Sequence, residues 1–370
     1  SFHRDYLATK FLSKFDGLET GVDKTAAAIE AFYGFEEQCR ATNQRLDKRV
    51  FPKGNAGFAI CRAREKIRRL LGDVDSDKLE RIFSRARFGP GVTSSCKGKW
   101  LSPHEKLACD GQVTTALHRI LSTSIRETDY PSWPAIHNRV PVLGNSVATV
   151  PKNSKTERTI AVEPHINAFF QRGVGVFFRD KLNRWGVNLR DQTRNQKLAE
   201  LGSLTGRLAT VDLRGASDTI SIECVRLLLP DSWCLLLEHL RSPVFSLGSE
   251  KKRYEKHSSM GNGYTFELES LIFSAVVTSV LDVLGLKSEW SVYGDDIIID
   301  ARALPLLHET IDYLGFSLNT SKTHSTGPFR ESCGSEWYDG VEVTPFYLRR
   351  KGCLVQLITF ANWLRTSADR

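Results

Sequence analysis

Residues 290–300 constrain the fold more than any other segment, because two adjacent acids lie there between two short apolar runs. The runs at 291–293 and 297–299 are rich in β-branched and aromatic residues, which favour buried strands. The sequence Gly-Asp-Asp at 294–296 joins the runs and is typical of a tight turn. We therefore predict a buried hairpin that presents two carboxylates at its tip.

A further acid, Asp212, extends this interpretation from a turn to a metal site. Two like charges at one turn repel each other unless a cation lies between them, although the tripeptide alone is more often an ordinary turn. Asp212 ends a predicted strand at 208–213, and if that strand neighbours the hairpin, Asp212 and Asp295 face one another. With Asp296 they would form an oxygen-ligand site suited to two Mg²⁺ ions, with Mn²⁺ as a substitute. Paired metals of this kind activate a 3′-hydroxyl and stabilise a pyrophosphate leaving group.

Charge is distributed unevenly along the 370 residues, which carry a formal net charge of +8. Residues 1–200 hold 34 lysines and arginines against 22 aspartates and glutamates, whereas residues 201–370 hold 17 against 21. A basic half suits phosphate backbones and an acidic half could hold divalent cations, while a solvated basic surface is the simpler alternative. The basic edges of the first half give these RNA-binding candidates: Arg81, Arg85, Arg87, Lys97 and Lys99.

The sequence shows no pattern of a membrane protein or of a secreted, disulfide-bonded domain. Its longest nearly uncharged apolar stretch, residues 271–281, is too short to cross a bilayer and is stopped by Asp282. Eight cysteines are scattered without a CxxC pair, so we expect intracellular thiols. The sequence begins with Ser1 and its only methionine is Met260, which indicates a fragment or a processed product.

The hydrophobic periodicity predicts an α+β fold. Residues 1–87 are helical in pattern, a Gly/Pro/Ser loop without the spacing of a P-loop follows at 88–100, and short strand-like runs lie at 140–143 and 146–150. After residue 200 the predicted order is strand 208–213, helix 220–229, helix 263–284, hairpin 290–300, helix 304–314 and strand 316–318. This order fits a ferredoxin-like antiparallel sheet.

Three motifs in this order resemble palm motifs A, B and C of RNA-dependent RNA polymerases. They are TVDLRGASD with Asp212 and Asp218, SSMGNGYTFELES at 258–270, and YGDD at 293–296. The chain is most similar to the replicase catalytic subunit of the single-stranded RNA phages, the leviviruses. Other stretches that resemble those replicases are VPKNSKTERTIAVEP at 150–164, GPFRESCG at 327–334 and VTPFYLR at 343–349. The resemblance spans roughly residues 88–350 and is far more specific than the GDD tripeptide alone.

This resemblance implies a right-hand polymerase that replicates a viral RNA genome from ribonucleoside triphosphates, on an RNA template, in the cytoplasm of an infected bacterial host cell. Helical fingers would occupy residues 1–205, and the palm would occupy 206–345, with motifs A to D and a fingers insertion near 230–257. Residues 346–370 would begin a thumb that is largely missing. The same resemblance implies that host translation elongation factors Tu and Ts and a ribosomal small-subunit protein join the chain.

The resemblance also implies roles for individual residues. The catalytic metal ligands would be Asp212, Asp295 and Asp296, and Lys322 would lie beside the leaving pyrophosphate as a general acid or a counter-charge. Cations over the incoming triphosphate would be Lys152, Lys155 and Arg158, with an exposed basic loop as the alternative. The residues that would meet the sugar are Asp218, Ser259, Gly261 and Asn262.

Asp218 would accept a hydrogen bond from the ribose 2′-hydroxyl, which a deoxyribose cannot offer. Glu269 stands near the place where many viral polymerases carry an asparagine, so it is an alternative sugar contact. A second alternative makes Glu267 and Glu269 partners of basic residues at the palm edge.

Two rival functions stay open on the sequence alone. A reverse transcriptase shares the palm and a YxDD turn, but it usually places a bulky aromatic residue soon after the first aspartate, and residues 213–216 contain none. A non-catalytic RNA-binding protein with a polymerase-like palm is the other rival. The three intact aspartates count against this second rival. Metal titration would separate a metal-dependent enzyme from a non-catalytic RNA-binding protein.

Overall fold

The computed structural model describes residues 2–15, 17–98, 101–124, 130, 133–349 and 353–368. The helices are α1 (Phe2–Phe11), α2 (Lys24–Asp47), α3 (Asn55–Leu71), α4 (Ser76–Phe83), α5 (Pro103–Leu107), α6 (Thr115–Ser124), α7 (His165–Arg184), α8 (Thr193–Thr205), α9 (Ile222–Leu228), α10 (Asp231–Leu240), α11 (Thr265–Val283), α12 (Leu304–Tyr313) and α13 (Leu354–Ala368). The strands are β1 (Gln112–Thr114), β2 (Val140–Val142), β3 (Asn145–Pro151), β4 (Glu157–Val162), β5 (Leu208–Val211), β6 (Val244–Leu247), β7 (Glu250–Arg253), β8 (Ser291–Tyr293), β9 (Asp296–Asp300), β10 (Phe329–Ser332), β11 (Ser335–Tyr338) and β12 (Val341–Glu342). Helices and strands are mixed along the chain, which confirms the predicted α+β class.

The antiparallel sheet β5-β9-β8 forms the centre of the C-terminal half. Val211 at the end of β5 pairs with Ile297 near the start of β9. Because alternate residues of a strand point to opposite faces, Ile297 and Ile299 join the main core, whereas Ile298 packs with Leu198 of α8. Burial of both faces explains why β9 is apolar without alternation, as the sequence suggested for this hairpin.

Helices cover this sheet on both sides. The buried helix α11 contacts β8 and β9 and packs against α3, α7 and α12, while α8 contacts all three strands from the other side. Small residues on α3, namely Ala56, Ala59 and Ala63, are buried and allow close approach of its neighbours. The predicted helices at 263–284 and 304–314 are therefore confirmed as α11 and α12. No helix in the described part of the chain is long and apolar enough to cross a membrane.

The strand predicted at 316–318 is wrong as a continuous strand. Two isolated bridges replace it beside β5, one between Leu213 and Leu318 and one between Thr210 and His324. The pairing breaks because the intervening segment turns, with the Lys322 N–H donating to the carbonyl of Asn319 at 3.0 Å. The turn leaves a short polar segment next to the end of β5.

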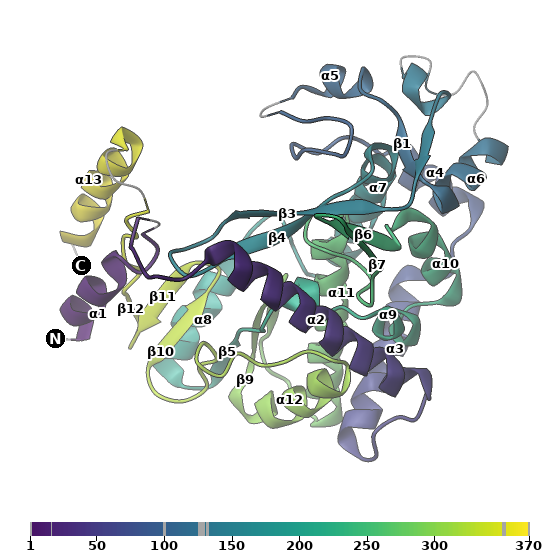
Figure 1. Cartoon of the computed structure of the whole chain (residues 1–370). Coiled ribbons are helices and arrows are strands. Elements are labelled where there is room, and N and C mark those ends of the chain that lie inside the picture. Colours follow the sequence, from purple (N-terminus) through teal and green to yellow (C-terminus); the bar gives the residue numbers. More distant parts are fainter. Residues whose placement is uncertain are drawn as a thin grey trace.

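A second sheet has the order β4-β3-β6-β7. Its long hairpin β3–β4 crosses the middle of the molecule in Figure 1, above the β5–β9 pair. The strands β6 and β7 come from the segment 230–257 and join this sheet through a parallel pairing of β6 with β3. The predicted strands at 140–143 and 146–150 are confirmed as β2 and β3. Two small sheets, β1-β2 and β10-β11-β12, complete the strands of the described residues.

Helix α2 runs diagonally across the front of the molecule in Figure 1 and connects segments that are far apart in sequence. Asn43 donates from Nδ2 to the carbonyl of Glu255 at 2.8 Å and accepts at Oδ1 from the N–H of Glu223 at 3.0 Å. Phe35 packs over Gly215, whose φ is 58° and where a Cβ would lie 2.4 Å from the Phe35 ring. Both the backbone conformation and the space therefore require glycine at 215.

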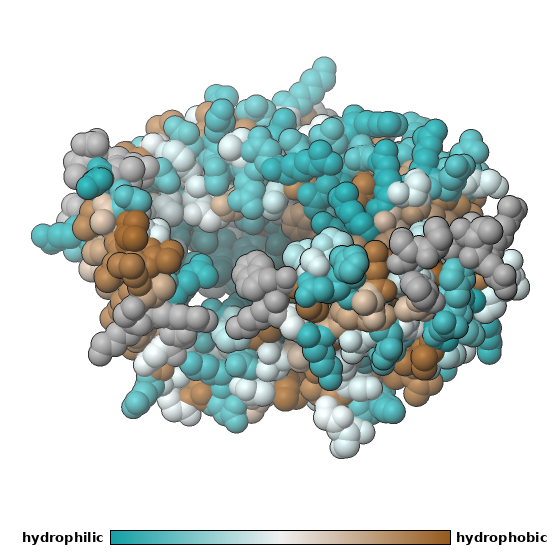
Figure 2. Space-filling model, turned by 90° about the horizontal axis from the view of Figure 1, so that it is seen from above, coloured by the Kyte–Doolittle hydropathy of each residue, from teal (hydrophilic) through white to brown (hydrophobic). Residues whose placement is uncertain are grey.

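The surface seen from above is mostly hydrophilic and is hollowed to the left of its centre (Figure 2). At the far left, where α1 and α13 lie in Figure 1, apolar side chains gather. Exposed apolar residues of α13 include Leu354, Val355, Leu357 and Ile358. The floor of the hollow is hydrophilic, so it offers polar groups to a ligand.

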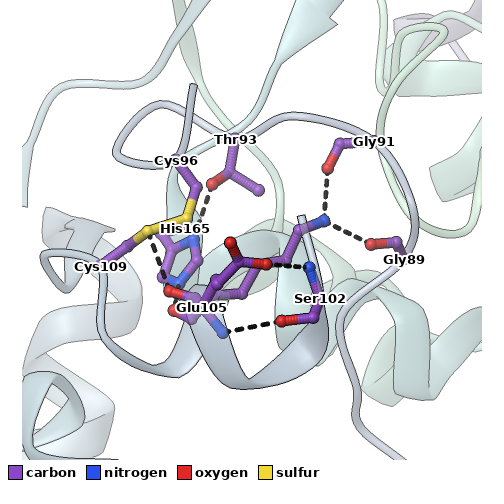
Figure 3. Close-up of a disulfide and its surroundings, with 9 residues drawn as sticks. Gly89, Gly91, Thr93, Cys96, Ser102, Glu105, Cys109 and His165 are labelled. Atoms are coloured by element: carbon purple, nitrogen blue, oxygen red, sulfur yellow. Dashed lines mark hydrogen bonds between the residues drawn. A yellow bond between two sulfur atoms is a disulfide. The ribbon is translucent and has the colours of Figure 1, made fainter. Parts of the chain in front are cut away.

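Cys96 and Cys109 form a disulfide, which corrects the expectation that all eight cysteines are thiols. The loop after α4 folds back onto α5 and brings the two residues together across a separation of 13 positions (Figure 3). Scattered spacing gives no sign of such a contact, because it depends on the path of the loop. The free cysteines are Cys39, Cys61, Cys224, Cys234, Cys333 and Cys353.

His165, at the start of α7, anchors the same loop from beneath (Figure 3). Its Nδ1 lies 2.6 Å from Thr93 Oγ1, and its Nε2 lies 2.8 Å from the carbonyl oxygen of Lys106. The ring stacks on Phe88 with centroids 4.4 Å apart. Burial lowers the pKa of His165 from 6.5 to about 4, so the folded protein keeps this ring neutral.

We expect His165 to make stability depend on pH in the acid range. Because its folded pKa of about 4 lies below the unfolded value of 6.5, the unfolded chain binds the extra proton first. The contribution of the neutral ring is complete above pH 6.5 and is lost as the pH falls toward 4, by about 3 kcal/mol. Urea unfolding of the wild type and of His165→Gln at several pH values measures it. The stability gap between the two should shrink as the pH falls, and a gap independent of pH would contradict the assignment.

Candidate active site

Three aspartates from two strands lie at the same end of the central sheet. Asp212 directly follows β5, whose last residue Val211 pairs with Ile297 of β9. Asp295 lies in the turn between β8 and β9, and Asp296 begins β9. The register of β5 against β9 therefore brings Asp212 next to the turn, as the sequence predicted for strands that neighbour each other.

Hydrogen bonds hold Asp296, and burial raises the pKa of both Asp295 and Asp296. Asp296 accepts at Oδ1 from the N–H of Cys333 at 3.0 Å and from Ser332 Oγ at 3.2 Å. Burial raises the pKa of Asp295 to about 6, and the charges of Asp296 and Asp212 add to this. Burial also raises the pKa of Asp296, against the effect of its two donors. Buried carboxylates that raise one another's pKa form a donor set that a divalent cation would stabilise.

The three aspartates do not form a closed cage of ligands. Within the described ranges, no three His, Cys, Asp or Glu side chains are drawn together as a ready metal site. The aspartates are neighbours whose charges act on one another. A Mg²⁺ ion held by so few protein ligands takes phosphate oxygens and water as its remaining ligands.

The basic segment lies at the turn of the β3–β4 hairpin. Asn153 closes this turn because its Oδ1 accepts from the N–H groups of Lys155 and Thr156, at 2.9 and 3.0 Å. Arg158 pairs with Val150 in the hairpin ladder. Lys152, Lys155 and Arg158 are all exposed, so their charges are available to a ligand.

Two of these cations lie within electrostatic reach of the aspartates. Crowding by protein atoms lowers the pKa of Lys152, the charges of Arg158 and Lys322 lower it further, and Asp212 opposes them. The charge of Arg158 acts in turn on Asp295 and opposes the rise in its pKa. The hairpin and the aspartates were predicted from separate motifs. In the fold they lie close enough for the charges of Lys152 and Arg158 to act with those of the aspartates.

The turn that interrupts the edge of the sheet supplies two neighbours for Asp212. Asn319 donates from Nδ2 to Asp212 Oδ2 at 2.6 Å, which fixes the orientation of the carboxylate. Lys322 Nζ lies 4.0 Å from the same oxygen, and its side chain is 57% exposed. Lys322 is therefore beside the candidate site, with its ammonium group accessible.

The loop before α11 presses against β4. Met260 accepts at its carbonyl from the N–H of Ala161 at 2.7 Å. Gly261 has a φ of 114°, and a Cβ there would lie 2.1 Å from the Ala161 carbonyl oxygen, so glycine is required. Asn262 accepts at Oδ1 from the N–H of Tyr264 at 3.0 Å. Its amide oxygen thus serves the start of α11, and the sugar contact of Asn262 stays a prediction.

Ser259 and Asp218 are both buried next to this loop. Ser259 accepts at its carbonyl from Thr265 Oγ1 at 2.8 Å. Asp218 ends the 3₁₀ turn Ala216–Asp218, and its Oδ1 lies 2.8 Å from Lys256 Nζ. Asp218 is therefore an ion-paired carboxylate, which the sequence alone did not indicate.

The two glutamates of α11 have different surroundings. Glu267 accepts at Oε1 from Arg179, at 3.0 Å from Nε and 2.5 Å from Nη2. Glu267 thus has the basic partner that the second alternative from the sequence gave it. Glu269 is buried, its Oε1 lies 3.0 Å from where a Cβ of Gly294 would be, and burial raises its pKa well above the usual range. Its Oε2 has no hydrogen-bond partner among the described residues. Glu269 therefore lies against the turn that carries Asp295.

The predicted RNA-binding residues lie in another part of the chain. Arg81 and Arg87 are exposed on and just after α4, which packs against α7. Arg85 is paired with Asp180 of α7, so part of its charge is already compensated. Lys97 is exposed beside the disulfide, and Lys99 falls outside the described residues.

Several residues at the site carried no signal in the sequence. Asn319 and Lys256 contact predicted site residues through polar side chains, and the sequence assigned no role to either of them. Ser332 and Cys333 stood in a stretch that resembled the replicases, but nothing there assigned them to Asp296. Only the tertiary contacts identify these partners.

Comparison with known proteins gives a consistent result. A family model described as RNA replicase, beta-chain, matches residues 1–368. The RNA-directed RNA polymerase subunit beta of Enterobacteria phage SP is 46% identical over 373 residues, which cover 98% of this chain and 63% of that protein. The corresponding subunit of Escherichia virus Qbeta is 44% identical over 364 residues, covering 95% and 59%. The chain thus spans roughly three fifths of the length of these relatives.

Among solved structures, an RNA polymerase complex described inside a dsRNA virus is similar over 78% of this chain and 29% of its own length. The TM-score of this match is 0.47, and the sequences are 10% identical. Both values are low.

Proposed function

Since the chain belongs to the RNA replicase beta-chain family, we propose that it synthesises RNA on an RNA template from ribonucleoside triphosphates, as the polymerase chain of a single-stranded RNA phage. One observation carries this proposal. Asp212, Asp295 and Asp296 converge from two strands while Lys152 and Arg158 act on them from a separate hairpin. An acidic site that faces a basic one suits a reaction between a hydroxyl and a triphosphate.

The carboxylates fit the metal that this chemistry needs. Asp212 and Asp295, with Asp296 beside them, would hold divalent cations, Mg²⁺ or Mn²⁺. When bound, such ions help to deprotonate a 3′-hydroxyl and neutralise a departing pyrophosphate. Asn319 orients Asp212, and the two donors to Asp296 hold that residue at the base of the turn.

The cations around the site would bind the triphosphate. Lys152 and Arg158 would contact the phosphates of the incoming nucleotide, with Lys155 at the outer end of the same turn. Lys322, exposed and 4.0 Å from Asp212, would meet the pyrophosphate as it leaves, as a counter-charge or a proton donor. Charge that builds on the phosphates would be stabilised by groups already in place.

In this proposal the two halves of the chain correspond to parts of a right-hand polymerase. Residues 1–205 form the fingers, 206–345 the palm, and 346–370 belong to the thumb. The segment 230–257 would be a fingers insertion, because its strands β6 and β7 extend the sheet of the basic hairpin. Template and product RNA would be the macromolecular partners, inside an infected bacterial cell.

The test is nucleotide selection by the full-length protein on one RNA template, with and without bacterial host extract. We expect kcat/KM to be much higher for a ribonucleoside triphosphate than for its deoxy analogue, because the analogue has no 2′-hydroxyl to donate to Asp218. Asp218→Ala should narrow this gap by about ten- to a hundred-fold, mainly by slowing ribonucleotide use. A preference for deoxyribonucleotides would establish a reverse transcriptase, and no synthesis under either condition would reject a polymerase.

A further inference from the structure

A buried lysine lies behind the candidate sugar-binding residue and has no role in the chemistry described so far. The side chain of Lys256 is 1% exposed, and its Nζ lies 2.8 Å from Asp218 Oδ1 and 3.7 Å from Glu36 Oε1. The ammonium also lies 4.3 Å from the ring centroid of Phe32. A buried charge needs such partners, because leaving one of them unpaired is costly.

The backbone holds Lys256 in this place. The N–H of His257 donates to the carbonyl of Ile220 at 2.7 Å, and an isolated bridge connects Lys256 with Ser221. Lys256 is thus fastened to the segment that directly follows Asp218. This pairing fixes the backbone of Lys256, and the 1% exposure of its side chain keeps the ammonium among its buried partners.

Helix α2 closes the arrangement from the other side. Glu36 accepts at Oε2 from the N–H of Glu255 at 2.7 Å, and Cys39 Sγ lies 3.6 Å from the carbonyl oxygen of Asp218. Burial raises the pKa of Glu36, and the charge of Lys256 opposes that rise. The three side chains Glu36, Lys256 and Asp218 form one buried charged group, which we call the buried triad.

Asp218 is the member of the buried triad that reaches the site. Its charge acts on Lys152 of the basic hairpin and on Glu269 of α11. Lys256 is too deeply buried to touch a nucleotide. Any influence of the lysine on the reaction must therefore pass through Asp218.

We propose that Lys256 is a positioning residue for ribose selection, holding Oδ1 of Asp218 so that the second carboxylate oxygen is kept ready to accept from a 2′-hydroxyl. The inference rests on the proposed function. A carboxylate with one oxygen fixed by an ammonium has one orientation, and a fixed orientation sharpens the distinction between a sugar that can donate and one that cannot. A lysine that only fastened the fold would affect both kinds of nucleotide alike.

The experiment measures the ratio of kcat/KM for matched ribo- and deoxyribonucleoside triphosphates in the wild type, Lys256→Met, Asp218→Asn and the double variant. We expect Lys256→Met to lower the ratio by about ten-fold, through slower use of the ribonucleotide. In the double variant the ratio should equal that of Asp218→Asn alone, because the lysine acts only through the carboxylate. Lys252→Met is the matched control, since Lys252 pairs with Glu250 at 2.8 Å on the exposed strand β7, and it should leave the ratio unchanged.

The outcomes distinguish a failure of the positioning role of Lys256 from a failure of the proposed function. An unchanged ratio in a folded Lys256→Met protein, with both rates lowered alike, would overturn the positioning role and leave the polymerase assignment intact. If Lys256→Met does not fold, the double variant replaces the buried pair by uncharged groups and is compared with Asp218→Asn, and any further change of the ratio would overturn the proposal. A wild type without synthesis would reject the proposed function itself.

Discussion

Replacing Asp295 or Asp212 with asparagine is expected to reduce nucleotide addition by roughly three orders of magnitude or more, with little effect on folding. Each change would remove one charged ligand from the proposed cation site and keep the shape of the side chain. Asp295 lies in a turn outside the strand ladder, and burial with two neighbouring acids already raises its pKa to about 6, so losing its charge costs the fold little. Rates of single-nucleotide incorporation on a primed RNA template would measure the effect.

Folding and RNA binding must be measured beside activity to interpret this result. Thermal unfolding and RNA affinity of the two variants should stay close to wild type. Asp282→Asn is a matched control, because Asp282 is exposed and pairs with Lys66 at 2.8 Å on the surface. Synthesis at the wild-type rate by Asp295→Asn or Asp212→Asn would show that the replaced residue is not a catalytic metal ligand.

The sequence predicted the fold correctly where the hydrophobic pattern of a segment reflects its burial in the folded chain. The run 297–299 must be buried on both faces, so its apolar residues predicted a central strand, and the two acids before it had to lie at the strand end. The same logic predicted α11, which is buried along most of its length because helices and strands surround it. Pairing of β5 with β9 then brings Asp212 beside the turn without further assumptions.

Partners that depend on the path of the chain could not be predicted. Lys256 reaches Asp218 only because its segment runs beside the residues that follow Asp218 and because α2 covers both. The disulfide between Cys96 and Cys109 depends on how a loop returns to α5. The edge strand at 316–318 failed for a related reason, since a local turn competed with strand pairing and placed Asn319 against Asp212. Hydrophobic periodicity does not report contacts of this kind, because polar and cysteine side chains form them.

The largest expected effect outside the aspartates concerns the basic hairpin. Replacing Lys152, Lys155 and Arg158 together with alanine should lower kcat/KM for nucleotides by about 10²- to 10³-fold, with both a higher KM and slower incorporation. Lys152 and Arg158 act on the aspartates in the folded chain, so they are placed to meet the same phosphates that the cation site would hold. RNA affinity should fall much less, because three side chains at one turn are a small part of an RNA interface.

The arginines near α4 separate RNA binding from this chemistry. Neutralising Arg81 and Arg87 should weaken RNA binding across sequences and flatten its dependence on salt by about one unit of slope for each phosphate that is no longer neutralised, while nucleotide KM stays near wild type. Arg85→Ala serves as the internal control, because its pairing with Asp180 already compensates part of its charge and its removal should change the slope less. Titrations of RNA at several salt concentrations, beside nucleotide kinetics at saturating RNA, measure the two quantities independently. Indistinguishable defects in the hairpin and arginine variants would show that one continuous basic surface, not two, serves both RNA and nucleotide.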